Sequence, residues 1–224
     1  MKKSFPLILV GAGLLIILVA IFFLTRNPKK ESTNDDQNIA VPELPAEQKP
    51  VISLIPTGNP RDTKAGNGKM LDLKVQKINI PGATSMDYEL VYTTGTGIQQ
   101  GVPGTVKLDG TDIDRPLLLG SESSGKFRYD AGVEIGTISF KFRNSSGKLI
   151  GKLQGNWHLQ TEVTELASVD GSFKYTLDKL AKGVYFLTMQ TFAAPDASTV
   201  VISANGYSVF ASDGKAHSGK IAGQ

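Results

Sequence analysis

Apolar and polar residues alternate with a period of two through most of the chain after residue 68. Successive side chains of a strand point to opposite faces of a sheet, so this alternation predicts half-buried β-strands. A change of parity between Val75 and Ile78 predicts a β-bulge near Gln76 and Lys77. We expect strands near 71–75, 88–92, 106–108, 138–142, 149–159, 173–177, 184–192, 200–204 and 207–210.

Turn residues separate these strands and predict how they connect. Asn144-Ser145-Ser146-Gly147 lies between two halves of a predicted hairpin over 137–161, and Asn205-Gly206 is a typical two-residue hairpin turn. Short strands with turn signals every ~8–12 residues favour an all-β fold, an antiparallel β-sandwich of the immunoglobulin-like type. A closed barrel is the alternative that the pattern leaves open.

One segment has a different pattern, because no charge occurs between Lys3 and Arg26. A helix over 4–25 would be ~33 Å long, enough to cross a hydrocarbon core of ~30 Å. We therefore expect residues 1–26 to be a transmembrane anchor, uncleaved because the run is long and has no small-x-small exit. Representative lipid-facing residues would be Leu7, Leu14, Ile17, Phe22 and Leu24.

The topology of this anchor follows from its flanks. Positive charges are nearly balanced on the two sides, and large domains translocate largely regardless of their charge. We expect a single-pass protein of the plasma membrane with a cytoplasmic N-terminus and an extracytoplasmic C-terminal domain. Cleavage as a signal peptide, giving a secreted domain, is the alternative.

Residues 27–68 differ in composition from both neighbours. They contain six of the 11 prolines among mostly polar residues, so they bury little apolar surface and predict a disordered stalk. The apolar patch Val51–Ile55 is an exception that could be a first strand. The predicted organisation is an anchor at 1–26, a stalk at 27–68 and a β-sandwich at 69–224.

Charge and cysteine content exclude several classes of function. Without Lys2, Lys3 and Arg26 at the membrane border, the 24 basic residues fall to 21, equal to the 21 acidic ones. No nucleic-acid partner is therefore expected. The absence of cysteine excludes disulfides and thiolate chemistry.

A short stretch resembles a known family. Asp170-Gly171-Ser172-Phe173 with Leu177, Leu180 and Gly183-Val184-Tyr185 is similar to the DGxFxxxxL…L…GxY pattern of bacterial immunoglobulin-like and carboxypeptidase-regulatory-like modules. The resemblance covers about 16 residues of the 224. It implies a β-sandwich that serves as a spacer, adhesive surface or accessory domain.

The candidate ligand-binding residues are basic. Between 126 and 152 the cations outnumber the acids by four, and such a surface could bind an anionic envelope polymer or lipid headgroups. A solvated sheet face is the alternative interpretation. The candidates are Lys126, Arg128, Lys141, Arg143, Lys148 and Lys152.

Other chemistry has little support in the sequence. Asp109, Asp112 and Asp114 on a glycine-containing turn are candidate ligands for Ca²⁺, with an ordinary turn as the alternative. We expect no other metal, no cofactor and no catalytic residues, because neither histidine has a partner at ligand spacing and no Gly-x-Ser-x-Gly occurs.

These features predict a non-enzymatic protein. The first hypothesis is a membrane-anchored surface or envelope interaction module, held by membrane lipid and binding an anionic envelope polymer or another surface protein. An accessory subunit of a membrane complex is the second hypothesis.

Overall fold

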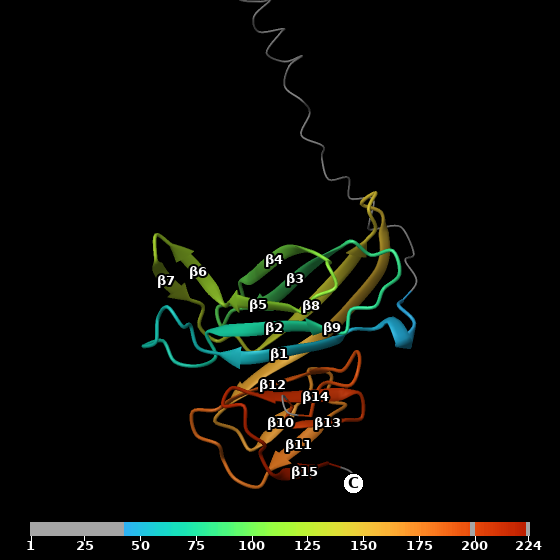
Figure 1. The fold of residues 1–224 in the computed structure, drawn as a ribbon. Coiled ribbons are helices and arrows are strands. Elements are labelled where there is room, and N and C mark those ends of the chain that lie inside the picture. The colour runs from blue at the N-terminus through green and yellow to red at the C-terminus, as the bar shows by residue number, and fades with distance from the viewer. Residues whose placement is uncertain (1–42, 198–199, 223–224) are drawn as a thin grey trace, which may run out of the picture. The chain divides into compact units, whose positions relative to one another are not determined.

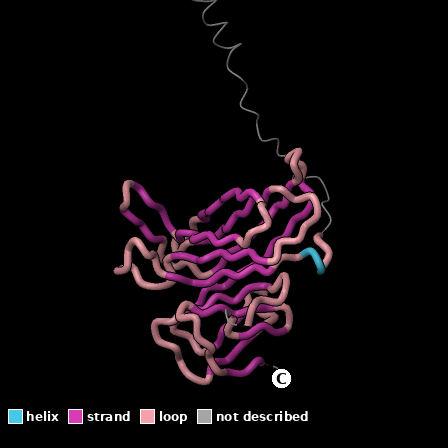
Figure 2. Tube along the Cα trace, in the orientation of Figure 1, coloured by secondary structure: helices cyan, strands magenta, loops and turns pink. Residues whose placement is uncertain are grey.

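A computed structural model describes residues 43–197 and 200–222, and their regular structure is almost entirely antiparallel β (Figures 1 and 2). The largest sheet has seven strands in the order β13-β14-β12-β9-β8-β3-β4. Its strands are β3 (Ser85–Thr93), β4 (Gln99–Lys107), β8 (Ile135–Arg143), β9 (Leu149–Thr161), β12 (Tyr185–Gln190), β13 (Ile202–Ala204) and β14 (Tyr207–Ala211).

Three smaller sheets complete the described structure. One has the order β1-β2-β5, formed by β1 (Val51–Thr57), β2 (Met70–Gln76) and β5 (Ile113–Leu118). A second has the order β10-β11-β15, formed by β10 (Glu165–Ala167), β11 (Lys174–Leu177) and β15 (Gly219–Ile221). The third is a hairpin of β6 (Gly120–Ser123) and β7 (Lys126–Tyr129). A 3₁₀ turn spans Ala46–Gln48.

The first hydrophobic core lies between the β1-β2-β5 sheet and one face of the seven-stranded sheet. Leu54 and Leu73 of the small sheet are fully buried in it, as are Leu90, Phe140 and Trp157 of the large sheet. Each such side chain contributes ~1.5–3 kcal/mol by leaving water. The period of two seen in the sequence is thus the alternation between this core and the opposite face.

A second core lies on the opposite face of the large sheet, at its β12–β14 end. Phe186 and Val209 point into it, whereas their chain neighbours Leu187 and Phe210 point into the first core. The β10-β11-β15 sheet covers this face with Leu166, Phe173, Tyr175 and Leu177. Strands β12 and β14 are therefore buried on both sides.

Strand β9 is 13 residues long and connects the two cores. It pairs with β8 over most of its length and with β12 near its end. His158 and Gln160 point away from the first core and bind β10: His158 Nδ1 lies 2.8 Å from the carbonyl oxygen of Ala167, and Ala167 N donates to Gln160 Oε1 at 2.8 Å. Strands β9 to β15 thus form a four-plus-three sandwich that is continuous with the first one.

The expected all-β antiparallel fold is confirmed, and open sheets packed face to face replace the alternative of a closed barrel. Both predicted hairpin turns are present. Asn205 and Gly206 have positive φ values of 52° and 78° between β13 and β14. Asn144 Oδ1 accepts hydrogen bonds from Ser146 N and Lys148 N in the β8–β9 turn.

The predicted domain boundary at 69 falls inside the folded unit. Val51–Thr57 forms β1, as the apolar patch suggested, and pairs with β2 along its whole length. Leu44 is also buried in the first core, and a Cβ added at Gly151 of β9 would lie 2.6 Å from its Cδ2. The proline-rich, polar composition predicted disorder for this segment. A few buried apolar residues nevertheless suffice to order a polar segment against a sheet.

Two further expectations concern the bulge near Gln76 and Lys77 and the membrane anchor. In place of a bulge, β2 ends at Gln76, and Lys77 takes a φ of 54° before a loop that buries Ile80. The predicted membrane anchor at 1–26 lies outside the described residues. From 43 to 222, with 198 and 199 left out, no helix is long and apolar enough to span a membrane.

Candidate binding site

Hairpin β6–β7 projects from one end of the first sandwich (Figure 1). Its turn is formed by Ser124 and Gly125, both with positive φ, as a tight two-residue hairpin turn requires. Along β7 the side chains alternate: Lys126 and Arg128 are exposed, and Phe127 and Tyr129 are half-buried. The hairpin therefore carries two cations on one face and an aromatic pair on the other.

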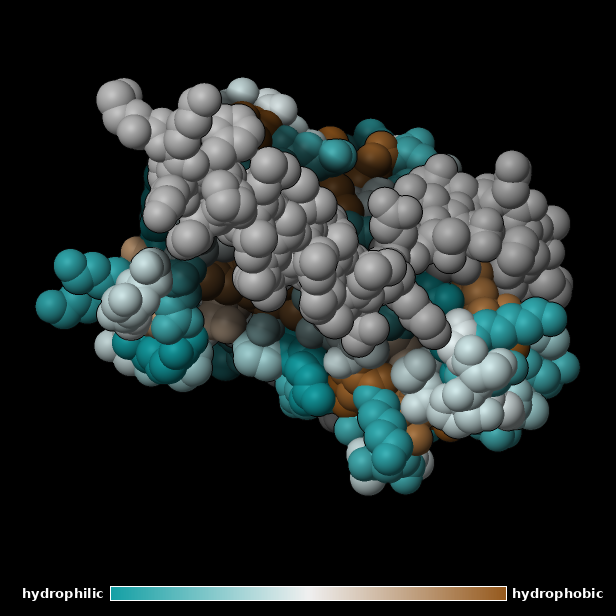
Figure 3. Space-filling model, turned by 90° about the horizontal axis from the view of Figure 1, so that it is seen from above, coloured by the Kyte–Doolittle hydropathy of each residue, from teal (hydrophilic) through white to brown (hydrophobic). Residues whose placement is uncertain are grey.

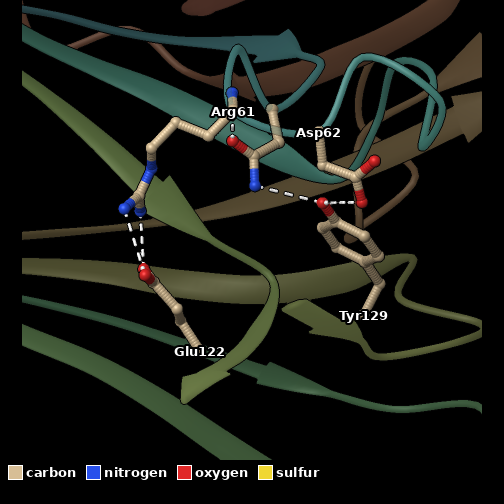
Figure 4. A network of polar contacts seen from close by, with 5 residues as sticks. Arg61, Asp62, Glu122 and Tyr129 are labelled. Atoms are coloured by element: carbon tan, nitrogen blue, oxygen red, sulfur yellow. Dashed lines mark hydrogen bonds and ion pairs between the residues drawn. The ribbon is translucent and has the colours of Figure 1, made fainter. Parts of the chain in front are cut away.

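A polar network fixes this hairpin to the loop between β1 and β2 (Figure 4). Arg61 forms a bidentate ion pair with Glu122 of β6, with N···O distances of 3.0 and 2.6 Å. The Tyr129 hydroxyl accepts a bond from Asn59 Nδ2 and donates one to Asp62 Oδ2, each 3.0 Å long. Burial raises the pKa of Tyr129, and the bond to Asp62 acts in the same direction.

Cation–π contacts strengthen the same attachment. The Arg61 guanidinium lies 4.8 Å from the centre of the Phe127 ring, and Lys69 Nζ lies 5.9 Å from that of Tyr129. Both distances are within the ~6 Å range of such interactions. The two rings stack on each other with centres 6.2 Å apart. These contacts attach the hairpin to Arg61 and Lys69, although Phe127 and Tyr129 belong to neither hydrophobic core.

A cleft of about 370 Å³ lies between the base of this hairpin and the β3–β4 turn. The turn is held close by a hydrogen bond from Gly95 N to the carbonyl oxygen of Ala131. Gly132 allows this approach, because a Cβ there would lie 2.6 Å from the Cα of Gly95. Polar side chains from both walls line the cleft: Thr94, Thr96, Gln100, Ser121, Arg128 and Asp130.

Asp130, which lines the cleft, accepts a hydrogen bond from a buried tyrosine outside the lining. Tyr92 is 2% exposed and donates its hydroxyl proton to Asp130 Oδ2 at 2.8 Å. Burial, followed by this bond and the carboxylate charge, raises the pKa of Tyr92 far above its usual value of 10.0. The bond orients the Asp130 carboxylate through Oδ2, and an ionised carboxylate can accept further hydrogen bonds.

The remaining predicted cations lie on the outer face of the large sheet, apart from hairpin β6–β7. Lys141 and Lys152 are opposite each other on β8 and β9, and Lys148 is exposed in the turn. Arg143 Nε lies 2.7 Å from Asp87 Oδ2 of β3. Because β3 brings Asp87 and Glu89 beside β8, this face is less cationic than the sequence interval suggested.

The surface seen from above is also mixed in hydropathy. Hydrophilic residues project at its margins, and hydrophobic residues lie between them (Figure 3).

The three aspartates of the calcium prediction have separate partners. Asp109 accepts from Thr111, Asp112 accepts from Gln76 Nε2, and Asp114 lies 3.6 Å from Lys74 Nζ. Among the described residues, no group of three or more His, Asp or Glu side chains could hold a metal ion. The structure therefore does not support the calcium candidate, because ordinary turn and cross-strand contacts use these carboxylates.

Sequence reasoning missed several residues of this site. Arg61 lay in the predicted stalk, and no strand was expected over 126–129. Phe127 and Tyr129 belong to neither core. The alternation Lys-Phe-Arg-Tyr at 126–129 is a strand signal that could have located β7, but the position of the Arg61 loop beside it depends on the tertiary fold.

Comparisons with protein-family models, with curated proteins and with solved structures returned no match for this chain.

Proposed function

We propose that this chain is a membrane-anchored, extracytoplasmic module that binds an anionic polymer of the cell envelope and is not an enzyme. In this proposal hairpin β6–β7 is the contact surface, and Lys126 and Arg128 are its principal cations. The apolar run at 7–24 would anchor it in the plasma membrane.

The single observation that carries the proposal is the fixed, projecting hairpin. Binding elements that are already ordered lose less conformational entropy when the ligand arrives. Arg61, Asn59 and Asp62 hold the hairpin from a different loop, so its exposed cations are presented on a rigid support. A hairpin that only connected β5 to β8 would not require this attachment to a separate loop.

Charge distribution favours the hairpin over the sheet face. On the outer face Asp87 binds Arg143, and Glu89 follows on the same strand. On β7 both cations are exposed and alternate with the aromatic pair. The binding candidates thus separate into two groups, and Lys126 and Arg128 form the one that we assign to the ligand.

The family resemblance is consistent with this role. Its residues fall in the second sandwich, where Asp170 shapes the turn before β11 by accepting from Ser168 and Ser172 N. Phe173 and Leu177 are buried there. We propose that this immunoglobulin-like or carboxypeptidase-regulatory-like part is the supporting module, while the first sandwich carries the binding hairpin.

Binding of polygalacturonate by the full chain in detergent micelles tests the proposal. The Lys126→Glu/Arg128→Glu variant should bind at least about tenfold more weakly, because two favourable charges become repulsive. The matched control is Lys148→Glu/Lys152→Glu, which makes the same change in net charge at two exposed positions of the β8–β9 hairpin.

The affinity of the control variant for polygalacturonate should fall less than about threefold, which is the loss expected from long-range electrostatics alone. Equal losses in the two variants would show that bulk charge governs binding. A larger loss in the control would assign the ligand to the sheet face, and no binding of the polymer by the unaltered chain would overturn the proposal.

A further inference from the structure

The cleft beside hairpin β6–β7 has a composition unlike that of a simple anion site. The lining residues include one cation, Arg128, and one carboxylate, Asp130. Asp130 would repel a phosphate or carboxylate group bound next to it, so an acidic group in this cleft has to lie at Arg128 and away from Asp130. The same carboxylate is an acceptor for ligands that carry hydroxyl groups.

The other lining side chains match hydroxylated ligands as well. Gln100 offers both an amide donor and an acceptor, and Ser121 and Thr96 offer hydroxyls on exposed parts of the two walls. Thr94 Oγ1 lies 2.9 Å from Thr96 Oγ1 and accepts a bond from Ile98 N. These bonds hold the β3–β4 turn together, and the bond to Thr94 orients the Thr96 hydroxyl.

An apolar contact is present at the same place. Ile98 is 57% exposed, the most exposed large hydrophobic residue described, and it lines the cleft together with the half-buried Tyr129. Sugar rings have apolar C–H faces as well as hydroxyls, so a cleft with both kinds of group suits them. The volume of about 370 Å³ lies in the range of small-ligand sites, ~300–1,000 Å³.

We infer that this cleft binds a sugar unit of an acidic polysaccharide, with Gln100, Thr96 and Asp130 bonding its hydroxyls and Arg128 its acidic group. The inference rests on the proposed function and narrows it, because it selects acidic glycans among anionic polymers. Hairpin β6–β7 supplies charge attraction, and the cleft supplies selectivity for hydroxylated units.

Two carboxylate polymers separate these contributions. Polygalacturonate carries ring hydroxyls beside each carboxylate, whereas poly-L-glutamate has none. The full chain in detergent micelles should bind polygalacturonate at least about tenfold more tightly than poly-L-glutamate at equal ionic strength. Thr96→Val/Gln100→Leu should abolish this preference and leave poly-L-glutamate binding unchanged.

Gln99→Leu is the matched control, because Gln99 is adjacent on β4 and points to the other face of the sheet. It should retain the preference. Gln100→Leu alone should lose part of it, and this single exposed change serves if the double variant has a lowered melting temperature.

The outcomes distinguish the two proposals. Equal affinities for both polymers in the unaltered chain would overturn the sugar inference and leave the anionic-polymer function intact. A preference that survives in Thr96→Val/Gln100→Leu would also overturn it, since the cleft would then not be its source. No binding to either polymer would overturn the proposed function itself.

Discussion

Gly136 of β8 is a residue at which a single methyl group matters. A Cβ there would lie 2.2 Å from the carbonyl oxygen of Val91 and 2.4 Å from the ring of Trp157. Trp157 is fully buried in the first core, and the Val91 carbonyl belongs to the paired strand β3. Neither group can move without disturbing the sheet or the core, so the position accepts only glycine.

Gly136→Ala should therefore lower the free energy of unfolding by at least ~2 kcal/mol, in the upper part of the ~1–3 kcal/mol that an extra group in a packed core usually costs. Urea denaturation monitored by Trp157 fluorescence measures this change. Gly101→Ala on β4 is the control, because its Cβ would meet no atom closer than 3.8 Å, and it should stay within ~0.5 kcal/mol of the unaltered chain. Equal effects of the two changes would contradict the packing argument.

Asp170 shows how the turn chemistry of the second sandwich depends on pH. Hydrogen bonds from Ser168 Oγ and from the Tyr207 hydroxyl, 2.5 and 2.6 Å long, lower the pKa of Asp170 from 3.8 to about 2. A carboxylate with a lowered pKa in the folded state stabilises the protein above its unfolded pKa. This contribution is lost as the pH falls towards the folded value.

Comparison of the unaltered chain with Asp170→Asn tests this linkage. The unaltered chain should be the more stable of the two at pH 5, and its advantage should shrink between pH 4 and pH 2. Chemical denaturation at a series of pH values measures the difference. Tyr207→Phe removes one donor and should move the loss to higher pH. An advantage that stays constant down to pH 2 would show that the Asp170 charge is not the cause.

At the scale of elements, β4 is one of the two edge strands of the seven-stranded sheet. The bonds from Thr94 N to Ile98 O and from Leu108 N to Thr84 O lie at the two ends of its ladder with β3. Hydrogen-bonded pairs recur at every second residue of an antiparallel ladder. In the β3–β4 register, the backbone N–H and C=O groups of the even-numbered residues of β4 therefore bond to β3. The backbone nitrogen of Pro103 therefore points to the open edge, where it interrupts the row of free donors.

Pro103→Val should weaken this protection by adding an outward N–H group to the middle of β4. We expect the variant to self-associate at concentrations at which the unaltered chain stays dispersed, as measured by light scattering. Lys107→Val adds a branched apolar residue to the same strand without a new donor and serves as the control. Association in the control alone would point to hydrophobicity rather than edge pairing.

At the scale of the whole molecule, two cores share one sheet. Leu187 and Phe186 are neighbours on β12, yet they belong to opposite cores. Residues 41–224 accordingly form one compact unit, which contains the predicted sandwich together with the part of the predicted stalk from 43 onward. Any stalk between the predicted anchor and this unit is therefore shorter than 27–68.

Protease treatment of intact cells tests the position of this unit. In cells that express the chain with a C-terminal tag, protease should release the tag and leave peptides from 1–30 in the membrane fraction, as identified by mass spectrometry. Cleavage before Leu44 is expected, because Leu44 is buried in the first core and β1 is paired with β2 along its whole length. A tag that stays protected until the cells are lysed would place the unit inside and contradict the localisation proposal.

Local pattern was sufficient for β2, β3, β8 and β9 of the first core and for the two predicted hairpin turns. Strand β8 alternates buried and less buried residues as its sequence does, and Asn205-Gly206 adopts the positive φ values that its turn requires. The pattern did not predict the full extent of strands whose apolar residues are not periodic. Strand β4 is interrupted by Gly101, Pro103 and Gly104, and it forms because β3 supplies a partner along its whole length.

The sequence by itself determined the all-β class, the polar and apolar faces of the main strands and the alternation that exposes Lys126 and Arg128. These features depend on neighbouring residues and on the fixed period of a strand. Only the tertiary structure decided that Arg61 holds hairpin β6–β7 and that Asp87 binds Arg143. It also decided that β12 lies between two cores. Such contacts join residues far apart in the chain, and no local pattern encodes which distant segments meet.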